Sequence, residues 1–129
     1  MKWLKIFAAF ILLHLFAWAS IHLYQTYKPG SVLVVVDTSF SMKAKFSKIR
    51  QWIDDYESQN RYKKILIGTD KAMLGDITEL QSKDVIFRTS FGKLQQSNLK
   101  RHYSGVKAGK KILLSDGSLT PDGWESIQF

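Results

Sequence analysis

The hydrophobic pattern of the chain changes character near residue 28. From Ile6 to Tyr24 most residues are apolar and no Lys, Arg, Asp or Glu interrupts them. This run is typical of a helix that crosses a bilayer, which needs about 20 residues. Beyond Lys28-Pro29-Gly30, a typical chain break, short apolar runs alternate with amphipathic stretches. We therefore expect a transmembrane anchor over residues 1–27 and one short folded domain over 28–129.

The pattern beyond the break predicts alternating strands and helices. Ser31–Val36 is a short β-branched run without alternation, which predicts a strand buried on both faces. The segment from Met42 to about Ser58 has apolar residues three and four apart, as in an amphipathic helix, at Phe46, Ile49, Ile53 and Tyr56. Further expected elements are strands at Lys64–Gly68 and Lys111–Leu114, a weaker strand or loop at Leu74–Leu80, a short extended piece at Val85–Phe87, and a helix from Phe91 to about Tyr103.

This alternation predicts an α/β fold, with a Rossmann-like, mostly parallel sheet flanked by helices. Ligands of such sheets bind at the carboxyl ends of the strands. Asp37 and Asp116 each come just after a predicted strand. We expect the strands at Ser31–Val36 and Lys111–Leu114 to be neighbours, so that both carboxylates reach one site. No strand is expected after Lys111–Leu114, which leaves one sheet edge bare and open to pairing with another chain.

The flanks of the apolar run predict the orientation of the anchor. Lys2 and Lys5 precede it, so the positive-inside rule places the N-terminus in the cytoplasm and the domain outside. We expect a single-pass protein of the inner (cytoplasmic) membrane with an extracytoplasmic, periplasmic domain. An aromatic belt at the outer interface is expected at Trp18, Tyr24 and Tyr27.

A cleaved signal peptide is the alternative interpretation of this segment. Ala17-Trp18-Ala19 before Ser20 matches a small-residue cleavage site. Ile21, Leu23 and Tyr24 continue the apolar run past that site to spanning length, which favours an uncleaved anchor.

Composition excludes some chemistry and favours some partners. The 129 residues contain no cysteine, which excludes thiol catalysis and cysteine-based zinc sites. The net charge of +8 suits acidic partners, but charge alone selects none of them, and a solvated basic surface is the default interpretation. We expect no nucleic-acid partner.

The segment Asp37-Thr38-Ser39-Phe40-Ser41 carries the candidate chemistry. Mg²⁺ prefers about six oxygen ligands at about 2.1 Å and keeps several waters. Asp37, Ser39 and Ser41 alternate, so a turning loop can direct one carboxylate and two hydroxyls to one point. Two neutral ligands leave the ion with an open, electrophilic position, which an outside carboxylate can occupy. The competing interpretation is capping of the following helix, for which serine and aspartate are favoured.

This segment, after a hydrophobic strand and before Met42 and a helix, resembles the D-x-S-x-S motif of von Willebrand factor type A (VWA) domains. Ile112-Leu113-Leu114-Ser115-Asp116-Gly117 resembles the family's later strand, which usually ends in Thr-Asp-Gly. The resemblance implies a short VWA-like domain with a metal-ion-dependent adhesion site. It implies that Asp37, Ser39 and Ser41 hold Mg²⁺, or Mn²⁺ or Ca²⁺, and that Asp116 supports them. A loop threonine also belongs to the family's site, and Thr89 is the candidate, although it lacks the usual preceding glycines.

The leading functional prediction is a membrane-anchored binding module, not an enzyme. A protein partner would contribute an acidic residue to the metal, and Phe40 is the candidate for an additional partner contact. The chain would act alone, as an oligomer, or as a subunit of a membrane complex.

Two alternatives stay open. A phosphatase resembling the haloacid dehalogenases also begins with an aspartate after its first strand, but it needs a second carboxylate two residues on, where this chain has Ser39. The other alternative is a metal-free scaffold whose short sheet is completed by a partner. Asp116-Gly117 also suits an ordinary turn.

Overall fold

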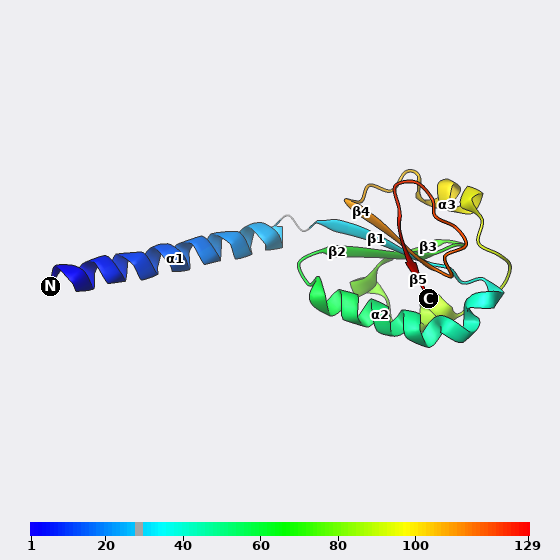
Figure 1. Ribbon diagram of the computed structural model, residues 1–129, viewed down its shortest axis with the longest axis horizontal. Coiled ribbons are helices and arrows are strands. Elements are labelled where there is room, and N and C mark those ends of the chain that lie inside the picture. The colour runs from blue at the N-terminus through cyan, green and yellow to red at the C-terminus, as the bar shows by residue number, and fades with distance from the viewer. Residues whose placement is uncertain (28–29) are drawn as a thin grey trace.

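The computed structural model describes residues 1–27 and 30–129, as a long N-terminal helix followed by an α/β domain. Helix α1 (Lys2–Tyr27) extends away from the domain (Figure 1). A mixed five-stranded sheet has the order β3-β2-β1-β4-β5. Its strands are β1 (Ser31–Val36), β2 (Lys64–Thr69), β3 (Met73–Asp76), β4 (Lys110–Ser115) and β5 (Glu125–Gln128). The remaining elements are the α-helices α2 (Phe46–Gln59) and α3 (Gln96–Tyr103) and the 3₁₀ helices η1 (Phe40–Lys45), η2 (Ile77–Glu79) and η3 (Lys83–Phe87).

Strand β1 lies at the centre of the sheet. It pairs in parallel with β2 and with β4, and β4 pairs in parallel with β5. Only the β2–β3 pairing is antiparallel. Val36, the last residue of β1, lies opposite Thr69 of β2 and Leu114 of β4. The prediction that β1 and β4 are neighbours is therefore confirmed, and the residues that follow β1, β2 and β4 all emerge at one end of the sheet.

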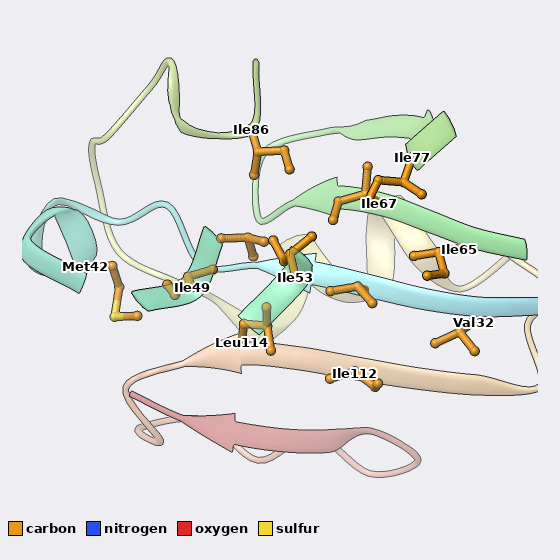
Figure 2. Packing of buried hydrophobic residues seen from close by; sticks show 12 residues of the cluster. Val32, Met42, Ile49, Ile53, Ile65, Ile67, Ile77, Ile86, Ile112 and Leu114 are labelled. Carbon is orange, nitrogen blue, oxygen red and sulfur yellow. The ribbon is translucent and has the colours of Figure 1, made fainter. Parts of the chain in front are cut away.

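Side chains of β1 alternate between two packed layers. One layer joins the sheet to α2 and contains Val32, Val34, Val36, Ile49 and Ile53 (Figure 2). The other joins the sheet to α3 and contains Leu33, Val35, Leu113, Leu99 and Tyr103. Each fully buried Val, Leu or Ile side chain contributes about 1.5–3 kcal/mol. Helices on both faces explain why β1 is apolar at successive positions rather than at every second one.

Helix α1 has the length and composition of a membrane span. Its first 23 residues, Lys2–Tyr24, are apolar enough to cross a bilayer, and none of that hydrophobic window is buried in the protein. Trp18 and Tyr24 of the predicted aromatic belt are exposed. The side chain of Tyr27 and the predicted break at Lys28-Pro29 lie outside the described residues.

Two predicted elements differ from the structure because local hydrogen bonds decide their form. The expected extended piece at Val85–Phe87 is wrong: it belongs to η3, whose start is capped by the Ser82 hydroxyl, which accepts from the Asp84 backbone N–H at 3.2 Å. The helix expected from Phe91 begins only at Gln96. The Phe91 N–H donates to Thr38 O at 3.2 Å instead of taking part in a helix.

The other boundaries also shift. The helix expected from Met42 starts as η1 and becomes α-helical at Phe46. The weaker strand expected at Leu74–Leu80 is β3 followed by η2. Strand β5 was not expected, because only Ser126 and Ile127 of its four residues are half-buried. It covers the side of β4 that was expected to be a bare edge.

Candidate functional site

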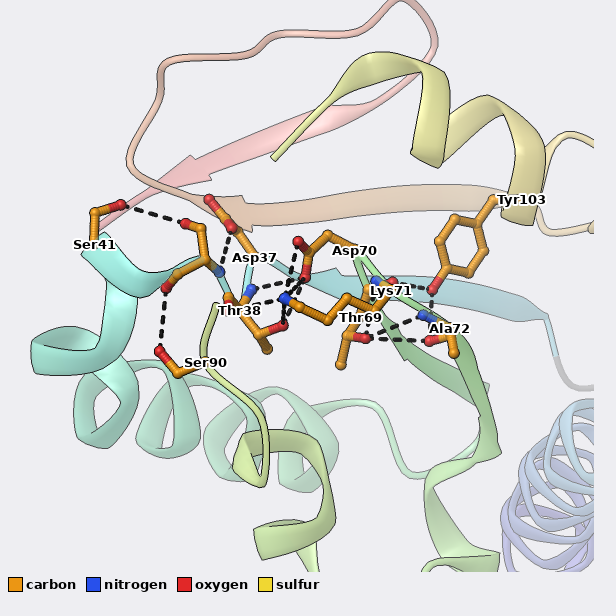
Figure 3. Close-up of polar contacts among 10 residues, drawn as sticks. Asp37, Thr38, Ser41, Thr69, Asp70, Lys71, Ala72, Ser90 and Tyr103 are labelled. Atoms are coloured by element: carbon orange, nitrogen blue, oxygen red, sulfur yellow. Dashed lines mark hydrogen bonds and ion pairs between the residues drawn. The ribbon is translucent and has the colours of Figure 1, made fainter. Parts of the chain in front are cut away.

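The segment Asp37–Ser41 turns at the carboxyl end of β1 and brings three predicted ligand residues together (Figure 3). Asp37 and Ser39 are 1% and 3% exposed, whereas Ser41 is open to solvent. The Ser39 backbone N–H donates to Asp37 Oδ1 at 2.9 Å, and the Ser39 and Ser41 hydroxyl oxygens lie 3.3 Å apart. The turn therefore places one buried carboxylate beside two hydroxyls, one buried and one exposed.

The Asp37 carboxylate is buried without a compensating cation. In the part of the chain that the structure describes, no Lys, Arg or His forms an ion pair with it. Burial raises the pKa of Asp37, the hydrogen bonds from Ser39 oppose that rise, and the nearby Asp70 and Asp116 carboxylates add to it. Removing a carboxylate from water disfavours its charged form. A bound cation at this position would favour the ionised form.

Asp70 is a second buried carboxylate at this end of the sheet, and the sequence analysis missed it. It follows β2 directly, is 2% exposed, and its backbone N–H donates to Val36 O at 3.1 Å. Asp70 Oδ1 accepts from the Thr38 backbone N–H at 3.0 Å and from the Thr38 hydroxyl at 2.6 Å. The signal was available, because Asp70 ends an apolar strand just as Asp37 does.

Lys71 neutralises Asp70 and also holds the Asp37–Ser41 turn. Its ammonium lies 3.2 and 3.3 Å from the two Asp70 carboxylate oxygens. It also donates to the Thr38 hydroxyl at 2.7 Å and to the Thr38 carbonyl at 3.0 Å (Figure 3). The loop after β2, which carries Asp70 and Lys71, is therefore attached to Thr38 by a fully hydrogen-bonded ion pair. Thr38 lies between the predicted ligands Asp37 and Ser39.

Tyr103 of α3 fixes the loop that carries this ion pair. Its hydroxyl donates to Thr69 O and, at 3.0 Å, to Ala72 O. Burial raises the pKa of Tyr103, and the Asp70 charge adds to the effect, so the phenol stays a neutral donor. A Cβ at Gly68 would overlap the Tyr103 hydroxyl, which explains why glycine occupies that position in β2.

The loop around Thr89 does reach the Asp37–Ser41 turn, but through other residues. Phe91 N–H donates to Thr38 O at 3.2 Å, and Phe40 N–H donates to Gly92 O at 3.3 Å. The Ser90 hydroxyl donates to Ser39 O at 3.5 Å. Thr89 itself is exposed, and no hydrogen bond of its side chain occurs among the described residues. The positive φ of Gly92, 70°, permits the turn that returns Phe91 toward Thr38.

Asp116 lies at the end of β4, beside the same turn. Its Oδ1 accepts from the Ser118 backbone N–H at 3.0 Å. Hydrogen bonding by Ser118 lowers the pKa of Asp116, and the Lys45 charge lowers it further despite partial burial. Because the Asp37 N–H donates to Leu114 O at 2.9 Å, the two loops are joined at their base. Asp116 is thus ionised and partly exposed, close enough to Asp37 to influence its titration.

Two exposed aromatic rings flank the turn. Phe40 is 72% exposed and Phe91 is 60% exposed. The Lys71 ammonium lies 4.4 Å from the centroid of the Phe91 ring, a cation–π distance. These rings offer an apolar surface next to the carboxylates.

The donor set was tested against a hard divalent cation. Within the described residues no cluster of three or more His, Asp or Glu side chains is close enough to hold a metal without other ligands. Any cation held here would need hydroxyl, carbonyl or water oxygens in addition to carboxylates. Two neighbouring ligands of an octahedral ion at about 2.1 Å lie roughly 3.0 Å apart. The 3.3 Å between the Ser39 and Ser41 oxygens is near this spacing, and the residues present fit such an ion.

Comparisons of the chain with models of protein families, with curated proteins and with solved structures found no match. The resemblance to VWA domains thus stays a prediction from the residues that carry it.

Proposed function

We propose that this chain is a membrane-anchored, VWA-like binding module that engages a protein partner through a divalent cation. Asp37, Ser39 and Ser41 would hold the cation, with Asp116 in support and the Thr89 loop beside them. The observation that carries the proposal is the buried Asp37 carboxylate, which has two hydroxyls next to it and no cation among the described residues. An isolated buried charge is costly unless it is paired or binds a metal.

The position of this carboxylate in the sheet supports a binding site. The proposal treats the mixed sheet as a variant of the doubly wound, Rossmann-like type, and the strand order β3-β2-β1-β4-β5 supports this. Sheets of this class often carry an antiparallel edge strand, as β3 is here. Their ligands bind where the direction of the connections reverses, between the first strand and the strand on its other side. In this chain that point lies between β1 and β4, where Asp37 and Asp116 emerge.

The proposed chemistry is that of a cation with few negative ligands. Mg²⁺, or Mn²⁺ or Ca²⁺, would supply an electrophilic position for an oxygen of the partner, and an aspartate or glutamate is the natural donor. Asp37 provides the main charge, and the two serine hydroxyls are neutral ligands. Phe40 would contact apolar groups of the same partner. No proton transfer or bond cleavage is required of these residues, and the module binds without catalysing a reaction.

The anchor would place this module on the outer side of the cytoplasmic membrane. Lys2 and Lys5 precede the apolar part of α1, and basic residues stay on the cytoplasmic side. The domain after residue 28 would then be periplasmic or otherwise extracytoplasmic. Its partner would be a protein of the same compartment or of the same membrane.

The metal is tested on the full chain in lipid nanodiscs, with thermal unfolding followed by near-UV circular dichroism. A ligand that binds only the folded state stabilises it by about 2.7 kcal/mol at a hundredfold excess over its dissociation constant. Millimolar Mg²⁺ is expected to raise the Tm of the wild type but not of Asp37→Ala. Asp122→Ala is the matched control, because Asp122 is an exposed aspartate of another loop. Equal shifts in wild type and Asp37→Ala, or no shift in either, would contradict the site.

Partner binding is tested by cross-linking in membranes. The proposal expects a set of proteins that is captured in Mg²⁺ and lost with a chelator or with Asp37→Ala, while Asp122→Ala captures it normally. Capture that persists under both treatments would move the binding function to another surface.

A further inference from the structure

The end of the sheet opposite Asp37 is where the chain enters the domain from α1. Tyr27 ends the helix and Ser31 begins β1, so four residue steps separate them, at most about 14 Å of extended chain. In Figure 1 the starts of β1, β2 and β4 and the end of α2 face the helix. This end of the domain is therefore held close to whatever surface surrounds the end of α1.

Backbone hydrogen bonds bring two basic segments to this entry point. Lys64 lies opposite Ser31 in the β1–β2 register, and its N–H donates to Gly30 O at 2.8 Å. On the other side of β1, the Gly109 N–H donates to Ser31 O at 2.9 Å, and the Ser31 hydroxyl donates to Lys107 O at 3.5 Å. The turns before β2 and β4 thus flank the first residues after the anchor.

Four exposed cations lie on these turns. They are Arg61, Lys63, Lys64 and Lys107, called here the basic end. Among the residues that the structure describes, none of the four forms an ion pair. Arg61, Lys63 and Lys64 precede or begin β2, and Lys107 precedes β4. The parallel pairing of β1 with both strands brings the two groups to the same end of the sheet.

The acidic groups near this end are already engaged. Glu125 pairs with Lys110 at 2.8 Å, and Lys83 is shared by Glu57, at 2.7 Å, and Asp54. Asp76 accepts from the Thr78 N–H at 3.0 Å and from its hydroxyl at 2.8 Å. Asp76 and one of the two carboxylates that share Lys83 lack a cation of their own, and the four exposed Arg and Lys residues outnumber them, so the net charge of these groups is positive.

The helix also touches the turn that carries two of these cations. The Tyr62 hydroxyl and His22 Nδ1 lie 2.8 Å apart, with ring centroids at 5.3 Å. Arg61 lies over the Tyr62 ring at 5.5 Å. A tyrosine between apolar helix and polar domain is typical of a membrane interface, where aromatic residues sit at headgroup level.

We propose that the basic end lies on anionic phospholipid headgroups and thereby orients the domain, with the Asp37 turn facing away from the bilayer toward its partner. The inference rests on the proposed membrane anchor, and it is independent of the metal. Each Lys or Arg near an anionic surface shifts a binding equilibrium by about fivefold. Removing all four charges is thus expected to lower the ratio of docked to undocked domain by several hundredfold.

Because the chain has no cysteine, a single donor dye can be placed at Gln59→Cys, at the exposed end of α2, or at Ser118→Cys beside Asp116. The labelled full chain is reconstituted in nanodiscs of phosphatidylcholine, alone or mixed with phosphatidylglycerol, that carry a headgroup acceptor. Energy transfer from position 59 is expected to rise in the anionic nanodiscs and to fall again with salt, which screens surface charge. Transfer from position 118 is expected to stay lower.

The charge variant is Arg61→Gln/Lys63→Gln/Lys64→Gln/Lys107→Gln. Its matched control, Lys48→Gln/Arg88→Gln/Lys93→Gln/Lys100→Gln, removes the same number of exposed, unpaired cations from other parts of the domain. The first variant is expected to lose the response to anionic lipid, and the control to keep it. An equal loss in both would show that only total charge matters, and no loss in the first would exclude the basic end. Either result overturns the proposal.

Further measurements separate this inference from a discrete phosphate site, from a failure of the anchor and from the proposed metal site. Inorganic phosphate is expected to reduce the transfer no more than chloride at equal ionic strength, and stronger competition would indicate a discrete phosphate site instead of a lipid surface. Chain that fails to enter neutral nanodiscs would overturn the anchor and this inference with it. The Mg²⁺-dependent Tm reports on the distant Asp37 turn, so its absence would contradict the metal and leave the lipid response intact.

Discussion

Asp37 and Asp70 are two buried aspartates at the same end of the same sheet, and their negative charges are compensated to different degrees. Each follows an apolar parallel strand and is at most 2% exposed. Asp70 has an ammonium within 3.3 Å and two hydrogen bonds from Thr38. Asp37 has one hydrogen bond from a backbone N–H and two neighbouring carboxylates that raise its pKa further, after burial. Asp70 is neutralised by its neighbour Lys71, and Asp37 has no ion-pair partner among the residues that the structure describes.

This difference is the reason for proposing that the Asp70 carboxylate is structural and that the Asp37 carboxylate binds a ligand. A buried ion pair with all its hydrogen bonds made joins two loops and needs no external ligand. A buried carboxylate beside hydroxyls and without an ion-pair partner is a costly arrangement, of the kind found where a protein binds a ligand. Three changes test this comparison, and they are taken in order of decreasing effect on stability.

Asp70→Ala is expected to have the largest effect. It leaves the Thr38 N–H without its acceptor and the Lys71 ammonium without its counter-charge. Breaking a buried pair costs about 3–5 kcal/mol, and because the Lys71 side chain is 20% exposed we expect about 3 kcal/mol. The midpoint of urea unfolding of the full chain measures it. Asp70→Asn keeps an acceptor for Thr38 and should lose less, and a loss below about 1 kcal/mol for Asp70→Ala would mean that the pair is not structural.

Asp37→Asn is expected to change the stability less than Asp70→Ala does, and to increase it, when metal is absent. Burial raises the folded-state pKa of Asp37 above the unfolded value of about 3.9. The folded state therefore binds this proton more tightly, and the stability that it contributes is present below the unfolded pKa and lost as the pH rises through the folded pKa. Between about pH 4 and pH 7, in a chelator, the wild type should lose more stability than Asp37→Asn.

Asp116→Asn is the internal control for that titration. The pKa of Asp116 is lowered, chiefly by its hydrogen bonds from Ser118, so its contribution is present above the unfolded pKa and is lost as the pH falls through the folded pKa. As the pH falls, the wild type should thus lose more stability than Asp116→Asn. Parallel urea-midpoint curves for the wild type and Asp37→Asn would show that the Asp37 carboxylate is solvated after all.

Ser41→Ala is expected to change stability least, by no more than about 0.5 kcal/mol, because Ser41 is exposed. Its effect should appear in metal binding, with an affinity for Mg²⁺ at least about tenfold lower. Isothermal titration of the full chain in nanodiscs measures this. Comparing Thr89→Ala with Ser90→Ala decides which residue of that loop supports the ion. A Ser41→Ala chain that binds Mg²⁺ as the wild type does would remove Ser41 from the site.

The contrast between Asp37 and Asp70 also marks the limit of prediction from the residues. The strands at Ser31–Val36 and Lys111–Leu114, and the gathering of Asp37, Ser39 and Ser41, were predicted because burial on both faces and close spacing along the chain are local properties. The pairing of Asp70 with Thr38 joins residues 32 positions apart, and no local pattern encodes it. The exposure of Thr89 follows likewise from how a distant loop returns to Thr38.

By itself, the sequence determined the elements whose pattern is local: an apolar helix of spanning length, a strand buried on both faces, and an amphipathic helix after it. It also determined which chemical groups follow each strand, since those groups are adjacent in the chain. Only the tertiary structure decided how Asp70 is held, because Thr38 reaches the adjacent Asp70 and Lys71 side chains across the parallel β1–β2 pair. It likewise gathered Arg61, Lys63 and Lys64 with Lys107 at the entry of the anchor. Charges far apart along the chain acquire a common position only when strand register has been set, and register is a property of the assembled sheet.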